Sequence, residues 1–205
     1  MWKTALEKEL FPDLCEVVHV PLHNQYVYLI QKNGSSSLRI QQSKENLRIF
    51  SNEQISSLSH VDIYIRNPRE RYVSGINTYV QHLQREHPEL DINTVLWFVK
   101  RYKFLNTHYL PQLFWIANLS KYLSVDTKLR FRNFQDFSKI ANIHSSAGVV
   151  APSQDFVQHI LDDSKIEFWA YVDQILLDLQ GKELLWNELL EHLETNFPLV
   201  LNALS

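Results

Sequence analysis

The sequence predicts an α/β fold in which helices flank a central parallel sheet and the C-terminal part is helical. Three segments suit strands: the continuous apolar run of residues 26–30, residues 61–66, which are rich in residues that favour strands, and residues 128–131. Each is followed by residues that can start a helix, and strands separated by helical crossovers form parallel sheets. After Pro152 the apolar residues recur at three- and four-residue spacing, which is typical of helices.

The first strand ends in a turn that has the chemistry of a phosphate site. The turn runs Lys32, Asn33, Gly34 and then three serines, residues 35–37, which can open a helix. A glycine lets a ligand approach the backbone, the free amides of a helix N-terminus attract anions, and the Lys32 ammonium adds positive charge. The alternative interpretation is a polar turn whose serines cap the helix. Because the lysine precedes the glycine, the phosphate loop of nucleoside triphosphatases is absent.

The second strand is followed by a helix start. Its apolar residues end at Arg66, and Asn67 suits the N-cap position. Pro68 suits the first helical position, and the Glu70 carboxylate can reach back to the cap. We therefore expect a helix from Pro68 to about Leu83.

Arg66, Arg71 and Ser74 can form a second anion site beside the first. Arg66 ends a strand, and Arg71 and Ser74 lie three residues apart on one face of the following helix. A guanidinium binds phosphate through two parallel hydrogen bonds, and a hydroxyl supplies a third donor. Ligands of open α/β sheets bind at the carboxyl ends of the strands, so both sites would face one ligand. The alternative is a solvated helix start in which the arginines pair with Glu70.

The rest of the chain predicts one more strand and then helices. The strand at residues 128–131 leads into an expected helix over residues 135–143. Two further helices are expected over residues 156–179 and 183–193, and Gly181 separates them. A C-terminal part built in this way is predominantly helical.

Length and charge limit the classes of protein that the chain can form. With 205 residues, 45% of them hydrophobic, it can build a core of its own. We expect one domain over residues 1–205, with an α/β core in residues 1–150 and a helical part in residues 151–205. The 20 Lys and Arg residues against 23 Asp and Glu residues leave a net charge of −3. Because this balance provides no broad positive field, we expect no nucleic-acid partner.

Cysteine and histidine usage favours a cytoplasmic protein without a structural metal. Cys15 is the single cysteine, so it can form neither an internal disulfide nor a Cys-rich zinc site. His19 and His23 are four residues apart, but Pro21 between them argues against a helical pair of metal ligands. No apolar stretch is long enough to span a membrane. We therefore expect a cytoplasmic location, no membrane span and no metal.

The two turn segments resemble the donor-binding elements of sulfotransferases. Residues 30–38 resemble the 5′-phosphosulfate loop of that family, and residues 65–75 resemble its 3′-phosphate element, in the same order along the chain. The likeness is strongest to carbohydrate sulfotransferases and their bacterial relatives, and it extends to residues 129–134 and 166–173. It implies a P-loop-like, nucleotide-binding core and transfer of a sulfuryl group from 3′-phosphoadenosine 5′-phosphosulfate to a hydroxyl or amine. The expected acceptor is a small molecule or glycan, with a carbohydrate as the leading candidate.

The resemblance also implies roles for individual residues. Lys32 and the amides of residues 34–37 would hold the 5′-phosphosulfate, while Arg66 and Ser74 would hold the 3′-phosphate. By analogy with phosphoryl transfer, negative charge grows on the leaving oxygen, and the Lys32 ammonium suits its stabilisation. The donor needs no metal in this scheme. The expected donor-binding residues are Lys32, Asn33, Gly34, Ser35, Ser36, Ser37, Arg66 and Ser74.

Two residues are candidates for the general base that a hydroxyl acceptor requires. His108 lies in a His-aromatic-x-Pro-Gln segment similar to one that follows the 3′-phosphate helix in the family. An imidazole titrates near neutrality and suits proton removal, although a histidine that bonds loop backbone is an equal alternative. Glu53 is the second candidate, because some sulfotransferases carry a catalytic glutamate about twenty residues after the phosphosulfate lysine.

Two other functions stay open at this point. The first is a regulatory protein on the same fold that binds the nucleotide without turnover, because the donor site is better defined than the base. The second is a kinase-like phosphoryl transferase. The kinase-like hypothesis is weakened because the chain lacks the glycine–lysine order of the Walker phosphate loop. It is weakened also by Asn67, which stands where an acidic magnesium ligand would be needed.

Overall fold

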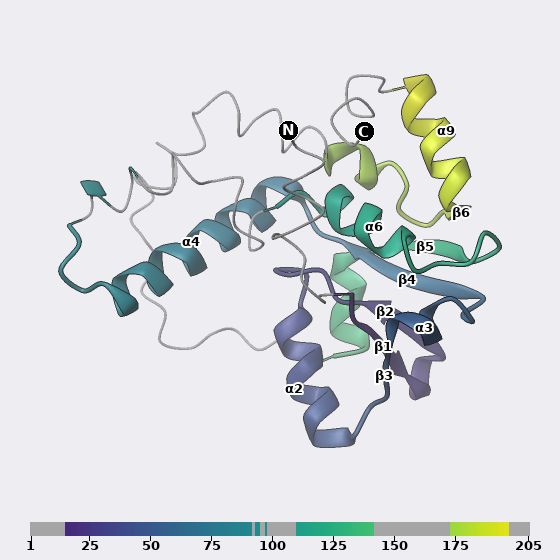
Figure 1. Cartoon of the computed structure of the whole chain (residues 1–205), viewed down its shortest axis with the longest axis horizontal. Coiled ribbons are helices and arrows are strands. Elements are labelled where there is room, and N and C mark those ends of the chain that lie inside the picture. The colour runs from purple at the N-terminus through teal and green to yellow at the C-terminus, as the bar shows by residue number, and fades with distance from the viewer. Residues whose placement is uncertain (1–14, 92, 95–96, 98–109, 142–172, 197–205) are drawn as a thin grey trace.

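The computed structural model describes residues 15–91, 93–94, 97, 110–141 and 173–196, and it contains a six-stranded open sheet flanked by helices (Figure 1). The α/β class expected from the sequence is therefore confirmed. The sheet order is β3-β1-β2-β4-β5-β6. The strands are β1 (Val17–Val20), β2 (Gln25–Tyr28), β3 (Ile49–Phe50), β4 (His60–Ile65), β5 (Lys128–Asn133) and β6 (Glu183–Leu185). The helices are α2 (Ser35–Glu45), α3 (Asn52–Ile55), α4 (Pro68–Glu86), α6 (Gln112–Ser120) and α9 (Trp186–Asn196), with 3-10 helices η1 (Pro21–His23) and η2 (Phe134–Lys139).

The sheet is mixed, which corrects the expectation of a parallel sheet. Only its centre is parallel, where β4 pairs with β2 on one side and with β5 on the other. β1 runs antiparallel to both β2 and β3, and β6 runs antiparallel to β5. β1 is only four residues long and joins β2 through η1 and Asn24, whose positive φ of 48° closes a hairpin. A helical crossover is unnecessary there because neighbouring antiparallel strands need only a short turn.

β6 replaces the beginning of the helix expected over residues 183–193. Gly181, at a φ of +82°, turns the chain back towards β5, and its N–H donates to the Phe131 carbonyl at 2.8 Å. Glu183 then lies opposite Arg130, and its carboxylate pairs with Arg130 Nε at 2.5 Å and with Lys128 Nζ at 2.9 Å. These cross-strand contacts hold three residues as a strand before α9 starts at Trp186. The helix expected over residues 135–143 is also different, since residues 134–139 form the 3-10 helix η2.

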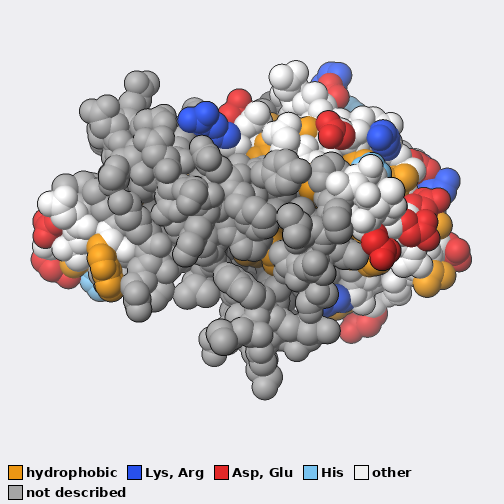
Figure 2. All heavy atoms as spheres, turned by 90° about the horizontal axis from the view of Figure 1, so that it is seen from above, with side chains coloured by type: hydrophobic (Ala, Val, Ile, Leu, Met, Phe, Trp, Pro, Cys, Tyr) orange, Lys and Arg blue, Asp and Glu red, His pale blue; other side chains and the backbone are white. Residues whose placement is uncertain are grey.

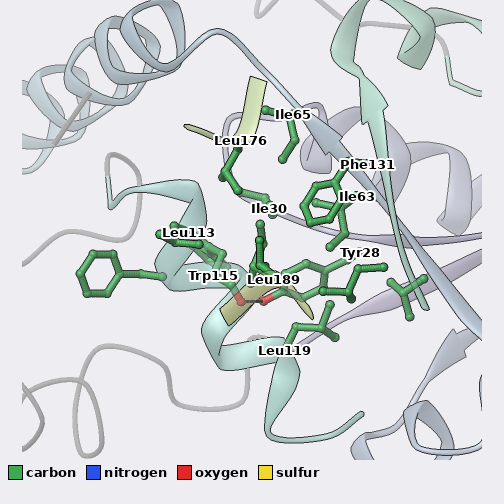
Figure 3. Close-up of a cluster of buried hydrophobic side chains, with 14 of the residues drawn as sticks. Tyr28, Ile30, Ile63, Ile65, Leu113, Trp115, Leu119, Phe131, Leu176 and Leu189 are labelled. Carbon is green, nitrogen blue, oxygen red and sulfur yellow. Dashed lines mark hydrogen bonds between the residues drawn. The ribbon is translucent and has the colours of Figure 1, made fainter. Parts of the chain in front are cut away.

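Apolar side chains cover both faces of the central strands. All six residues of β4 are buried, and its alternate residues enter two different clusters. One cluster joins the sheet to α6 and α9 and contains Tyr28, Ile30, Ile63, Ile65, Leu113, Trp115, Phe131 and Leu189 (Figure 3). The other joins the opposite face to α2 and η2 and contains Val18, Val27, Leu29, Leu38, Tyr64 and Phe137. Burial on both faces explains the continuous apolar runs in β2 and β4.

α4 begins where the local sequence predicted. The Glu70 N–H donates to Asn67 Oδ1 at 3.2 Å, as expected of an N-cap followed by Pro68. The helix ends at Glu86 instead of Leu83. The Glu70 carboxylate lies 3.8 Å from Arg66 Nε. α4 extends away from the sheet in Figure 1 and carries one wall of the cavity described below.

Charged side chains are mixed in sign on the visible surface. Figure 2 shows Lys and Arg side chains interspersed with Asp and Glu side chains over the described part of one face. An exposed ion pair of the described residues is that of Lys139 with Asp136. Such exposed pairs contribute at most about 1 kcal/mol each, so they do not determine the fold.

Gly34 is required by packing, and its replacement is expected to destabilise the protein. Its φ is +79°, and an added Cβ would lie 2.4 Å from Phe137 Cε1. The positive φ costs about 1–2 kcal/mol and the overpacking about 1–3 kcal/mol, so Gly34→Ala should lower the free energy of unfolding by about 2–5 kcal/mol. Gly181→Ala is the matched control, because Gly181 has a φ of +82° but, within the described part of the chain, an added Cβ would meet no atom within 4 Å.

Urea unfolding of both variants measures this difference. Gly181→Ala should lose only the conformational cost of about 1–2 kcal/mol. Equal losses in the two variants would show that contact with Phe137 does not constrain Gly34.

Candidate functional site

The turn after β2 and the turn after β4 meet at the carboxyl ends of neighbouring parallel strands. Arg66, the first residue after β4, donates from Nη1 to the Lys32 carbonyl at 2.9 Å. α2 starts directly after the first turn and α4 directly after the second (Figure 1). The two predicted anion sites therefore lie at one edge of the sheet, as the parallel pairing of β2 with β4 requires.

Lys32, Arg66 and Ser74 line one open cavity of about 710 Å³ beside α4. The remaining residues of the predicted donor loop have different environments. Asn33, Ser35 and Ser37 are buried, Gly34 is half-buried, and Ser36 is exposed. The residues that line the cavity are Lys32, Arg66, Asn67, Arg69, Glu70, Val73, Ser74, Asn77, Thr78 and Gln81.

Lys32 is a strained and partly desolvated cation. Its φ is +68°, a region that non-glycine residues rarely adopt. Its Nζ donates to Thr78 Oγ1 of α4. Burial and, to a smaller extent, the positive charges of Arg66 and Arg71 together lower the pKa of Lys32 to about 8. Mutual repulsion among these cations favours the binding of an anion between them.

Two guanidinium groups hold the Lys32 turn in its strained conformation. Arg66 Nη1 bonds the Lys32 carbonyl, and Arg71 Nε donates to the Gln31 carbonyl at 3.1 Å. A positive φ at a residue with a side chain costs of order 1–3 kcal/mol and persists only where its surroundings enforce it. The turn is thus fixed from the α4 side by two charged donors.

Arg66 combines an aromatic contact with weak charge pairing. Its guanidinium lies 5.3 Å from the centre of the Phe134 ring. The Glu70 carboxylate approaches Nε to 3.8 Å, but the Glu70 side chain is 67% exposed, so solvent screens this pair. Burial lowers the pKa of Arg66, and Glu70 opposes that effect. Arg66, which lines the cavity, therefore keeps a positive charge that Glu70 offsets only weakly.

Arg71 does not line the cavity, which corrects its predicted place in the second anion site. Its side chain is buried, and among the described residues its Nη2 has no hydrogen-bond partner. The pKa of Arg71 is lowered to about 10, because burial, assisted by the positive charge of Arg66, outweighs the opposing negative charge of Asp173. Arg71 supports the Lys32 turn from behind, while Ser74 at the next turn of α4 reaches the cavity.

The structure shows neither candidate base, Glu53 nor His108, beside Lys32, Arg66 and Ser74. Glu53 is exposed on α3, where its carboxylate accepts a hydrogen bond from Ser51 Oγ at 2.9 Å. α3 leads through a short turn to the amino end of β4, whereas Lys32 and Arg66 follow carboxyl ends (Figure 1). The structure therefore does not bring Glu53 and Lys32 together. His108 lies outside the described residues.

Sequence reasoning missed three residues that shape the site. Thr78 Oγ1 accepts a hydrogen bond from the Lys32 ammonium. Gln112 and Asp173 form a buried hydrogen-bond network with Asn33 behind the turn. Thr78 could have been found, because it lies four residues after Ser74 and so on the same helix face. Gln112 ends the His-aromatic-x-Pro-Gln segment and Asp173 ends residues 166–173, but both are far from the turn in sequence and no local pattern assigns them contacts with it.

Two kinds of feature are absent from the described part of the chain. Among these residues, no group of three or more His, Cys, Asp and Glu side chains could hold a metal ion. Nor is any helix there both long and apolar enough to cross a membrane. Cys15 is buried, and this burial raises the pKa of its thiol to about 12, so it does not supply a thiolate nucleophile.

Comparison of the chain with protein-family models, with curated proteins and with solved structures finds no match. The function of the site is therefore inferred from its residues and from their geometry. The relevant features are two cations at neighbouring strand ends, a hydroxyl on the following helix, and one cavity that all three line.

Proposed function

We propose that the chain is a sulfotransferase that uses 3′-phosphoadenosine 5′-phosphosulfate as its donor. The observation that carries this proposal is the shared cavity of Lys32, Arg66 and Ser74 at the ends of two parallel strands. Two cationic groups at separate turns suit one ligand that carries two separated phosphate groups. The segment from β2 through the Lys32 turn to α2 supports a P-loop-like arrangement for the 5′-phosphosulfate. Arg66 and Ser74 would bind the 3′-phosphate.

The electrostatics of the turn fit such a donor. The pKa of Lys32 is lowered by burial and by two neighbouring arginines, so a polyanion relieves a repulsion that the free protein contains. α2 begins directly after Gly34, and the N-terminus of a helix attracts the oxygens of an anionic group such as a phosphosulfate. Asn33 is turned inward to the Tyr64 carbonyl, so its side chain supports the loop from behind instead of binding the donor.

Transfer of the sulfuryl group exchanges one sulfur–oxygen bond for another. An acceptor oxygen bonds to sulfur, the bond from sulfur to the oxygen it shares with the 5′-phosphate breaks, and the acceptor proton passes to a base. Charge grows on the leaving oxygen, where the Lys32 ammonium would stabilise it. His108 and Glu53 are the candidate bases, and a carbohydrate hydroxyl is the leading acceptor. The products are a sulfate ester and adenosine 3′,5′-bisphosphate.

Donor binding predicts stabilisation by the spent donor. Adenosine 3′,5′-bisphosphate at 100 times its dissociation constant should add about 2.7 kcal/mol to the free energy of unfolding. For a chain of this length that is a rise in melting temperature of roughly 5–10 °C. Thermal unfolding with and without the ligand measures the rise. A larger rise with ATP and magnesium than with the bisphosphate would instead favour a kinase-like phosphoryl transferase.

Turnover is tested separately from binding. The protein is incubated with donor labelled in its sulfate group and with sugar, lipid, phenol and peptide acceptors, and labelled products are separated. The proposal predicts a sulfated product, with sugars the leading class. Tight binding of the donor without a product from any acceptor class would support a protein that binds the nucleotide without turnover.

Affinity for the bisphosphate should fall at alkaline pH. The pKa of Lys32 in the free protein is about 8, and a bound phosphate raises it in the complex. Affinity therefore falls above about pH 8, by at most tenfold per pH unit, until the pH passes the pKa of the complex. Lys32→Arg keeps its charge, so its affinity should stay level over the same range. Calorimetry at each pH measures the affinity of both proteins. If the affinity falls equally with pH in the wild type and in Lys32→Arg, a group other than Lys32 is responsible.

A further inference from the structure

We propose that Gln112 is a positioning residue that joins the two donor-binding turns into one rigid unit, and that Asp173 sets the orientation of its side chain. The importance of this unit for donor binding rests on the proposed function. The unit itself is a property of the free protein and can be tested without any ligand. Both residues lie outside the cavity and are buried, with exposed fractions of 0% for Gln112 and 3% for Asp173.

The Gln112 carboxamide pairs with the backbone of Arg66 as a neighbouring strand would. Its Nε2 donates to the Arg66 carbonyl at 3.0 Å, and its Oε1 accepts from the Arg66 N–H at 3.0 Å. Arg66 follows the last residue of β4, where the ladder with β5 ends. The side chain of Gln112 therefore satisfies both backbone groups at a point where no strand continues the sheet.

The same carboxamide also holds the first turn. Gln112 Oε1 accepts a second hydrogen bond from Asn33 Nδ2 at 2.5 Å, and Asn33 Nδ2 also donates to the Tyr64 carbonyl at 2.7 Å. Asn33 adjoins Lys32 in the chain, so the lysine is anchored to the end of β4 through its neighbour. Gln112 thus connects the backbone that carries Arg66 to the turn that carries Lys32.

Asp173 determines which way the carboxamide points. Its Oδ2 accepts from the Gln112 backbone N–H at 2.7 Å and from Gln112 Nε2 at 3.3 Å, and its Oδ1 accepts from the Leu113 N–H at 3.0 Å. A carboxylate only accepts hydrogen bonds, so it selects the amide nitrogen of Gln112. The carboxamide oxygen is then left for its two donors, Asn33 and Arg66. In a reversed amide the oxygen would face two acceptors, the Arg66 carbonyl and Asp173 Oδ2, and the nitrogen would face two donors, the Arg66 N–H and Asn33 Nδ2.

Gln180 provides a matched control at the same strand end. It is half-buried, and its Nε2 donates to the Ile65 carbonyl at 3.2 Å, one residue before Arg66. Among the described residues this bond ties Gln180 to β4 and not to the Lys32 turn. Replacing Gln180 by Leu removes a glutamine that bonds the strand, while Gln112→Leu removes one that bonds both the strand end and the turn.

Hydrogen exchange of the free protein tests the connection. The amides of Asn33 and Leu38 donate to the Ile30 and Gly34 carbonyls, so they report on the turn. In Gln112→Leu their exchange should become at least about tenfold faster, while the amides of β4 and β5 keep their protection. In Gln180→Leu the turn should keep its protection. Unchanged exchange in folded Gln112→Leu, or an equal increase in both variants, overturns the proposal.

Gln112→Glu keeps the test decisive if Gln112→Leu does not fold. The substitution preserves the shape of the side chain and its Oε1, and it replaces Nε2 by a second oxygen. When ionised, this oxygen faces two acceptors, the Arg66 carbonyl and the Asp173 carboxylate; when protonated, it can again donate a hydrogen bond to one of them. Protection factors of the turn should therefore be low at pH 8 and recover at pH 5, with the wild type as reference at each pH. Equal protection factors at both pH values overturn the proposal.

The link to donor binding is measured on the same variants. If the wild type binds adenosine 3′,5′-bisphosphate, Gln112→Leu should bind it about 10- to 100-fold more weakly, because the two turns are no longer held in register. Gln180→Leu should bind it within about threefold of the wild type. Wild-type affinity in Gln112→Leu overturns the positioning role. Failure of the wild type to bind contradicts the proposed function, and the exchange experiment still decides whether the unit exists.

Discussion

Lys32→Ala is expected to reduce sulfuryl transfer by about 10³-fold, which corresponds to about 4 kcal/mol of lost transition-state stabilisation. The ammonium carries the positive charge at the carboxyl end of β2, and burial and two arginines make it a poorly solvated cation. A group of this kind stabilises developing negative charge more than a hydrated surface lysine does. The rate is measured at saturating donor, so that weaker binding does not enter the comparison.

Lys44→Ala is the control for this variant. Lys44 is an exposed residue in the last turn of α2, on the helix that the Lys32 turn precedes. Lys44→Ala should leave the rate within about twofold of the wild type, because it only changes the charge of a solvated surface.

The melting temperature of Lys32→Ala should not fall, since the variant removes a cation whose burial is unfavourable. A rate near wild type in a folded Lys32→Ala protein contradicts the catalytic role.

Arg66→Ala is expected to weaken bisphosphate binding by about 30- to 150-fold, or roughly 2–3 kcal/mol, which is typical of a lost hydrogen bond to a charged group. Arg66 lines the cavity with its guanidinium and also bonds the Lys32 carbonyl. Calorimetry with adenosine 3′,5′-bisphosphate and with adenosine 5′-phosphate separates the two effects. The wild type should prefer the bisphosphate, and Arg66→Ala should bind both ligands with similar affinity.

Arg69→Ala is the matched comparison for Arg66. Arg69 lines the same cavity but is exposed on the first turn of α4. It contributes to the general positive potential, so its removal should cost about twofold to threefold and should not change the preference for the bisphosphate. An equal loss in both variants would show that the cavity attracts anions without a specific contact from Arg66. A retained preference in Arg66→Ala would assign the 3′-phosphate to other residues.

Local signals in the sequence predicted the centre of the fold well. β4 is a continuous apolar run because both of its faces are buried, and α4 begins at Pro68 because Asn67 caps it. Both signals depend on residues adjacent in the chain. The meeting of Lys32 with Arg66 was likewise predictable, since it follows from placing two strands in parallel.

The edges of the sheet could not be predicted in the same way. β3 has two residues and β6 has three, too few for an alternating pattern to appear. β6 exists because Gly181 turns the chain and Glu183 meets Arg130 and Lys128, contacts between residues more than fifty positions apart. Taken alone, residues 183–193 have the apolar spacing of a helix, so pairing with β5 overrides the local preference.

Arg71 lies in the core and not in the cavity, where its helical spacing had placed it. Arg71 and Ser74 are neighbours on α4, but Arg71 lies beside the buried stripe formed by Tyr72, Ile76 and Val80. The guanidinium therefore points to the core, where Asp173 partly compensates its charge. The stripe was visible in the sequence, but the carboxylate that permits an arginine there lies about a hundred residues later. Gln112 was missed for the same reason.

A crystal structure of the protein with adenosine 3′,5′-bisphosphate would show whether one nucleotide occupies both strand ends. We expect one ligand whose 5′-phosphate contacts Lys32 and the amides at the start of α2, and whose 3′-phosphate contacts Arg66 and Ser74. Two results would contradict the claim that the two strand ends bind the two phosphates of the same nucleotide. The first is a ligand bound at another surface, and the second is a ligand that contacts Lys32 but not Arg66, or Arg66 but not Lys32.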